Sequence, residues 1–218
     1  MMHSFANYCV FVDGKSAADL VIFMELYSQP GALNGLNEVE TEELVSFVDR
    51  LIALLDDTVQ PNEHFQYTIC DTLRICFRVK LPLAFVQISL LFNNLLKLCE
   101  NECHNFNNNT PTSNENIPLI ALKCLVNILF NDTDRMNIFC GHNAVNGVQR
   151  LSLLLQHVTM KCEENKTNEI TNMLLPVWQY VVKIFYMTVS QRCVPIVWLQ
   201  IVVLFSLLVF CTQFTNIH

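Results

Sequence analysis

Apolar residues recur at steps of three and four along most of this chain, with few helix-breaking residues between them. This spacing places apolar side chains along one side of a helix. The 218 residues include five glycines and seven prolines, whereas a chain built of strands needs a turn about every 8 to 12 residues. The pattern therefore predicts an all-α protein.

The breaks in the pattern predict seven or eight helices, one of them short. Asn116 and Asp132 are expected to cap helices, because their side chains can accept a hydrogen bond from a free N–H of the first turn. Gly141 is expected to end the short helix that Asp132 begins. The expected spans are 17–27, 41–56, 62–78, 82–99, 117–131, 132–140, 144–160 and 171–190.

Repetition of long and short helices without strands predicts an armadillo/HEAT-like helical solenoid, in which each unit buries its apolar face against its neighbours. A globular helical bundle is the alternative. We expect residues 1–192 to form one armadillo-like helical repeat domain. Within it, residues 101–116 hold seven asparagines without periodicity, and we expect a disordered Asn-rich loop there.

The C-terminal segment 193–218 differs from the rest. Residues 194–211 are 18 residues without a charge, close to the roughly 20 that cross a bilayer. Three interpretations stay open: a transmembrane anchor, a buried terminal helix, and the tail of a truncated product that lacks further repeats. With Lys183 and Arg192 on its N-terminal side, an anchor would leave the body in the cytoplasm. We therefore expect a cytoplasmic protein. The alternative is association with a membrane or the cell cortex through residues 194–211.

Composition and motifs argue against several function classes. The net charge of −7 and the lack of a basic stripe argue against nucleic acid as a partner. No nucleophile elbow, phosphate loop, zinc-protease motif or dinucleotide fingerprint is present, so no enzyme, cofactor or catalytic residue is predicted. Cys99, Cys103 and His104, with Cys140 and His142, match no common zinc spacing, and free thiols are expected instead of a metal site.

Two polar pairs stand out as candidate binding residues. Arg74 and Arg78 are four residues apart on one helix, away from its apolar stripe, and Asn127 and Asn131 are placed alike on another. In a bundle these would be solvated side chains, and Arg74 would pair with Asp71. On the concave side of a solenoid they would form a floor of guanidiniums and amides. Such a floor suits a peptide or helix that ends in a carboxylate.

A family resemblance sharpens this prediction. The segment IPLIALKCLVNILFN, residues 117–131, resembles the stretch around the SLKCLCN motif of the Ric-8 (synembryn) family. Upstream, TEELVSFVDRLIALLDDTVQP and EHFQYTICDTLRICFR look like the family's second and third helices, including two arginines. Downstream, LPVWQYVVKIFYMTVSQR is similar to a later helix, with more differences. The resemblance covers roughly residues 16–192.

The resemblance implies an armadillo-like, non-receptor guanine-nucleotide exchange factor and chaperone for heterotrimeric G-protein α subunits (Gα). In that family the concave surface captures the C-terminal helix of Gα, so that GDP leaves and the nucleotide-free form is held. The positions that match the family's contacts are Arg74, Arg78 and Asn127, with Asn131 beside them. The family's further C-terminal repeats are not visible in this sequence, so the chain is expected to bind Gα and to be weak or inactive in exchange. The competing hypothesis is a tail-anchored helical-repeat scaffold without G-protein activity.

Overall fold

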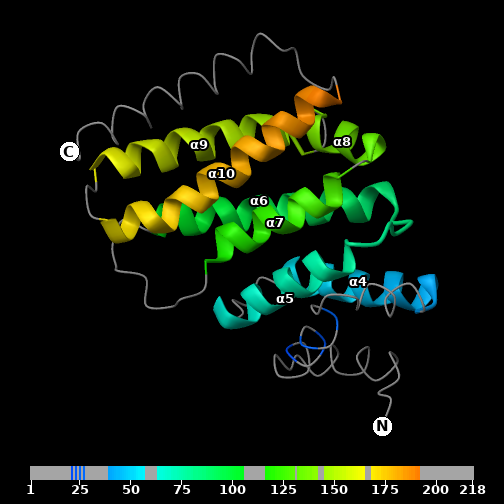
Figure 1. Cartoon of the computed structure of the whole chain (residues 1–218). Coiled ribbons are helices and arrows are strands. Elements are labelled where there is room, and N and C mark those ends of the chain that lie inside the picture. Colours follow the sequence, from blue (N-terminus) through cyan, green and yellow to red (C-terminus); the bar gives the residue numbers. More distant parts are fainter. Residues whose placement is uncertain are drawn as a thin grey trace.

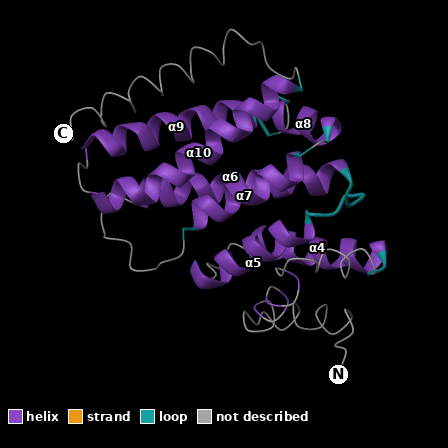
Figure 2. Ribbon diagram, viewed as in Figure 1, coloured by secondary structure: helices purple, strands orange, loops and turns teal. Residues whose placement is uncertain are grey.

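The computed structural model is all-helical in the part of the chain that it describes, as the sequence predicts (Figure 2). This part comprises residues 39–56, 63–105, 116–130, 132–141, 145–164 and 168–191, together with Val21, Phe23, Glu25 and Tyr27. Its helices are α4 (Thr41–Asp56), α5 (Glu63–Cys76), α6 (Phe85–Asn105), α7 (Ile117–Leu129), α8 (Thr133–Cys140), α9 (Gly147–Glu164) and α10 (Asn168–Ser190).

The predicted caps are confirmed. The Asn116 side chain accepts a hydrogen bond from the Leu119 N–H at 2.9 Å, and the Asp132 side chain accepts one from the Arg135 N–H at 3.0 Å. Each bond satisfies an N–H that has no partner within its own helix. Gly141 ends α8, and its N–H donates to the carbonyls of the last turn. Local sequence chemistry thus sets the beginning of α7 and both ends of α8.

Several predicted boundaries are wrong, among them the ends of α6 and α5. α6 continues to Asn105, so residues 101–105 of the expected loop are helical, because this polar stretch contains no glycine or proline and extending a formed helix costs little. α5 ends at Cys76 instead of reaching Arg78. After Cys76 the backbone changes from four-residue to three-residue hydrogen bonds, since the Arg78 N–H donates to the carbonyl of Ile75. Pro82 follows shortly and disfavours a further turn.

The long helices of the described region form two layers of three. α4, α6 and α9 lie side by side in one layer, and α5, α7 and α10 form the other (Figure 1). Each helix also packs against its sequence neighbour in the other layer, which gives the pairs α4–α5, α6–α7 and α9–α10. The short α8 contacts α6, α7 and α9. Helix pairs stacked in chain order are the arrangement expected of a helical-repeat protein.

α7 occupies the centre of the array, between α5 and α10 in its own layer and against α6 in the other. Ten of its 13 residues are buried, so it is apolar on nearly all sides. Its three exceptions are Leu119, Lys123 and Asn127, which follow one another at four-residue steps along one face. This placement matters for function, because the two polar residues among them point away from the core.

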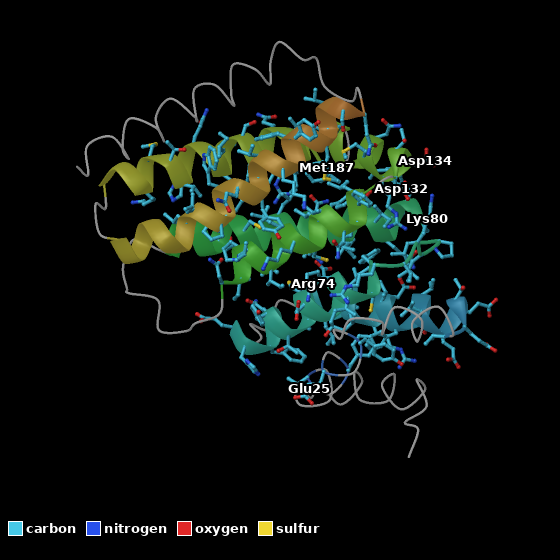
Figure 3. The ribbon with its side chains drawn as sticks, in the orientation of Figure 1. Glu25, Arg74, Lys80, Asp132, Asp134 and Met187 are labelled. Atoms are coloured by element: carbon cyan, nitrogen blue, oxygen red, sulfur yellow. The ribbon has the colours of Figure 1, made fainter. Side chains whose placement is uncertain are left out.

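A charged cluster joins two connections of the array that are far apart in the chain. Arg135 is 8% exposed, and its Nε lies 3.3 Å from a carboxylate oxygen of Asp132. The same guanidinium donates to the carbonyl of Leu81 and lies 5.5 Å from the ring centroid of Phe77. Lys80 approaches Asp132 to 3.5 Å from the solvent side, and Figure 3 shows both at one edge of the array. The cluster ties the α5–α6 connection to the start of α8.

Several predictions lie outside the described residues. These are Asn131, the loop residues 106–115, the C-terminal segment 193–218 and most of the expected helix 17–27. Among the helices that are described, none is long and apolar enough to cross a membrane.

Candidate binding groove

Three helices of one layer enclose a groove of about 370 Å³. It opens along α5, α7 and α10, the same three helices that pack side by side in chain order. Each of the three helices contributes at least one charged and one apolar or aromatic side chain to the lining. The lining residues are Tyr67, Asp71, Arg74, Ile120, Lys123, Val126, Asn127, Tyr180 and Lys183.

The groove is basic although the chain is acidic. Arg74, Lys123 and Lys183 face a single carboxylate, that of Asp71, whereas the chain as a whole carries a net charge of −7. Walls of low dielectric strengthen the field of such a charge cluster. The excess of positive charge among its lining residues therefore favours an anionic ligand.

Arg74 lines the groove as the sequence predicts, but an acidic neighbour neutralises it. Its Nε lies 2.5 Å from Oδ1 of Asp71, three residues earlier on the same helix. The two side chains are 21% and 17% exposed, so the pair is partly shielded from water. Figure 3 shows Arg74 at the level where α5 meets α7. The pairing expected for a simple solvated helix face is thus present within the groove.

Asn127 has a structural contact in addition to its place in the lining. Its Nδ2 donates to the backbone carbonyl of Arg74 at 2.8 Å. That carbonyl lies in the last turn of α5, where the normal helical donor would be the N–H of Arg78. Because the Arg78 N–H bonds to Ile75 instead, the Asn127 amide supplies the missing donor and joins α7 to α5.

Arg78, a third predicted residue, does not line the groove. Arg78 lies in the turn after α5, and its Nη1 donates to the backbone carbonyl of Tyr27 at 3.2 Å. Burial lowers the pKa of its guanidinium, and the charge of nearby Arg74 lowers it further. Its position follows from the early end of α5, which breaks the four-residue alignment with Arg74. Asn131 falls outside the described residues.

The sequence reasoning missed Lys123, Tyr180 and Lys183. Lys123 Nζ lies 5.8 Å from the centroid of the Tyr180 ring, and Lys183 Nζ lies 5.5 Å from the same centroid. The available signal was the position of Lys123 four residues before Asn127, on the same helix face. Lys183 and Tyr180 could not be found in that way, since only the packing of α10 against α7 brings them there.

The cysteines and histidines considered for zinc binding form no metal site among the described residues. No three side chains of His, Cys, Asp and Glu converge there as metal ligands. Cys99 is buried and lies 3.7 Å from the carbonyl of Pro118, and Cys140 is partly buried. The side chains of Cys103, His104 and His142 are outside the described set.

Comparison of the chain with models of protein families, with curated proteins and with solved structures finds no match. The groove has a basic floor with two tyrosines and is formed by three neighbouring helices of one layer. Such a floor can bind an anionic peptide without covalent chemistry.

Proposed function

We propose that this chain is a Ric-8-like protein that binds the C-terminal helix of a heterotrimeric G-protein α subunit in the groove of α5, α7 and α10. In this proposal the array is an armadillo-like solenoid and the groove lies on its concave side. The protein acts in the cytoplasm as a guanine-nucleotide exchange factor and chaperone that works by binding alone, and this chain is weak or inactive in exchange.

One observation carries the proposal. Arg74 and Asn127, two of the positions that match the family's contacts by sequence resemblance, line one basic groove and touch each other through the Asn127 amide and the Arg74 carbonyl. They come from helices 53 residues apart in the chain. Family resemblance and groove geometry thus point to the same surface.

The mechanism would be differential binding. A chain that holds the Gα C-terminal helix away from its own domain favours the nucleotide-free conformation over the GDP-bound one. The same coupling makes GDP and the regulator weaken each other's binding. No acid, base or nucleophile of the chain is needed for such a step.

Peptide binding to the full chain tests the proposal. A fluorescent peptide of the Gα C-terminal helix is titrated with the protein, and a peptide of identical composition in scrambled order serves as the control. Fluorescence anisotropy should show saturable binding of the first and weaker binding of the second. Equal binding of both peptides, or none by a chain whose circular dichroism is helical, would overturn the proposal.

A further inference from the structure

The cations that are free to bind a ligand in the groove are the lysines, not the arginines. The Arg74 guanidinium is paired with Asp71, and Arg78 is turned toward the carbonyl of Tyr27 outside the lining. Neither Lys123 nor Lys183 forms an ion pair with a described residue. After the internal pair is set aside, the groove retains two positive charges.

Tyr180 lies within reach of both lysine charges. Lys183 lies three residues after Tyr180 on α10, and Lys123 comes from α7. Both ammonium groups lie within cation–π range of the one ring, at 5.5 Å and 5.8 Å from its centroid. The ring attracts each ammonium, so the two lysines are held at the groove before any ligand arrives.

Both lysine charges lack an acidic partner in the described part of the chain. No ion pair joins Lys123 or Lys183 to a described carboxylate. A ligand with carboxylates at this place supplies that partner and forms charge-assisted hydrogen bonds. Tyr67, Ile120 and Val126 line the same groove and offer contact to the apolar side chains of a peptide.

We infer that Lys123, Tyr180 and Lys183 form a dicationic subsite that takes the carboxylates of an anionic peptide segment. The inference rests on the proposed function where that segment is the Gα C-terminal helix. It assigns anion recognition to Lys123 and Lys183, with Tyr180 as the positioning residue. Arg74 then acts mainly within its internal pair with Asp71.

Charge-removing and charge-retaining variants of the full chain test the subsite. The variants are Lys123→Ala with Lys183→Ala, the charge-retaining Lys123→Arg with Lys183→Arg, and Lys97→Ala as a matched control, because Lys97 is exposed on α6 in the other layer. Three fluorescent peptides serve as probes: the Gα C-terminal helix, an unrelated helical peptide with two glutamates on one face, and its glutamine counterpart.

The double alanine variant should bind the Gα peptide and the glutamate peptide at least about tenfold more weakly, since each lost charge-assisted contact contributes substantially to affinity. The arginine variant and Lys97→Ala should bind both as the unmodified chain does. Glutamine in place of glutamate should weaken binding to the unmodified chain and change little in the double alanine variant. Arg74→Ala should lower affinity less than the double lysine change.

The outcomes separate this inference from the proposed function. Binding of the Gα peptide that is unchanged in the double alanine variant would overturn the subsite and leave the Gα proposal standing. Binding of the glutamate peptide through the two lysines, without binding of the Gα peptide, would support the subsite and overturn the Gα proposal. Absence of binding by either peptide to a helical chain would overturn both.

Discussion

Asn127 shows how one side chain serves both the packing and the groove. Its Nδ2 bond to the Arg74 carbonyl, at 2.8 Å and partly buried, joins α7 to the end of α5. Loss of this bond leaves a partly buried carbonyl without its donor. The residue that the sequence marks as a peptide contact is therefore also a link between two helices.

We expect Asn127→Ala to lower the free energy of unfolding by about 1 kcal/mol, the usual net contribution of one such bond. Urea unfolding followed by circular dichroism measures this change. Asn127→Asp serves as the comparison, because it keeps the side-chain shape, removes the donor and sets a carboxylate against the carbonyl, so it should destabilise more. Equal stability of both variants and the unmodified chain would show that the bond contributes nothing.

At the residue scale the sequence predicts the capping residues well and the groove only in part. Asn116 and Asp132 are identified because their bonds are made within three residues. Arg74 is placed correctly by helix spacing, while Arg78 is not, because the end of α5 depends on backbone bonds that spacing does not reveal. Lys183 depends on contacts between α10 and α7, which no local pattern encodes.

Between α5 and α7, three buried thiols report on the integrity of one helix interface. Cys70 and Cys76 of α5 and Cys124 of α7 are fully buried, and the two α5 thiols influence the pKa of the third. Burial raises the pKa of Cys70 to about 12, and it also raises the pKa of Cys76 and Cys124. Thiols in this state are protonated near neutral pH and poor nucleophiles.

We expect Cys70, Cys76 and Cys124 to resist alkylation by iodoacetamide at about pH 8 until the chain unfolds, because only the thiolate reacts. Cys140 is less buried and should react before these three. Mass spectrometry of the labelled peptides, with and without denaturant, measures the order. Labelling of the three buried thiols as fast as Cys140 in the folded chain would contradict the buried interface.

The same three thiols should make the free energy of unfolding decrease as the pH rises, because their pKa values are raised in the folded chain. Their folded pKa values lie above the ordinary 9.0, so the folded state holds protons that the unfolded state releases. Their contribution to the free energy of unfolding is complete below pH 9.0 and is lost as the pH rises toward about 12. Urea unfolding over this range should show a decreasing free energy of unfolding. Replacement of the three cysteines by alanine should flatten the dependence.

The contact between α8 and α9 depends on a glycine. An added Cβ at Gly147 would lie 2.5 Å from ring carbons of Phe139, closer than real contacts allow. The residue before it, Asn146, has a φ of 53°, a left-handed conformation that asparagine adopts more readily than most residues. Close approach and a sharp entry turn thus let α9 begin directly against α8.

We expect Gly147→Ala to destabilise the chain by about 1–3 kcal/mol, because it overpacks the buried Phe139 ring. Gly141→Ala is the matched control, since its Cβ would lie 3.2 Å from the nearest atom and its φ of −64° suits any residue. Thermal unfolding of both variants gives the comparison. A larger loss for Gly141→Ala would contradict the assigned contact.

At the scale of the helices, the sequence predicts types and order because apolar periodicity is a local signal. It predicts the ends less well, as the extra turn of α6 to Asn105 shows. Polar residues do not by themselves end a helix.

The whole array explains why the groove exists at all. The helices α5, α7 and α10 share a layer only because each helix pair packs on its neighbour in chain order. Residues from 67 to 183 then meet at one surface, although they are far apart in the chain. The repeat-like architecture follows from the sequence pattern, while the basic character of the groove emerges only from the stacking.

The most direct test of the central claim is complex formation between the full chain and an intact Gα subunit. The chain is mixed with GDP-bound Gα, or with Gα that lacks its last C-terminal helical turns, and each mixture is separated by size-exclusion chromatography. We predict co-elution with intact Gα and separate elution from the truncated form. Separate elution from both, or equal co-elution with both, would contradict the claim that this groove receives the Gα C-terminal helix.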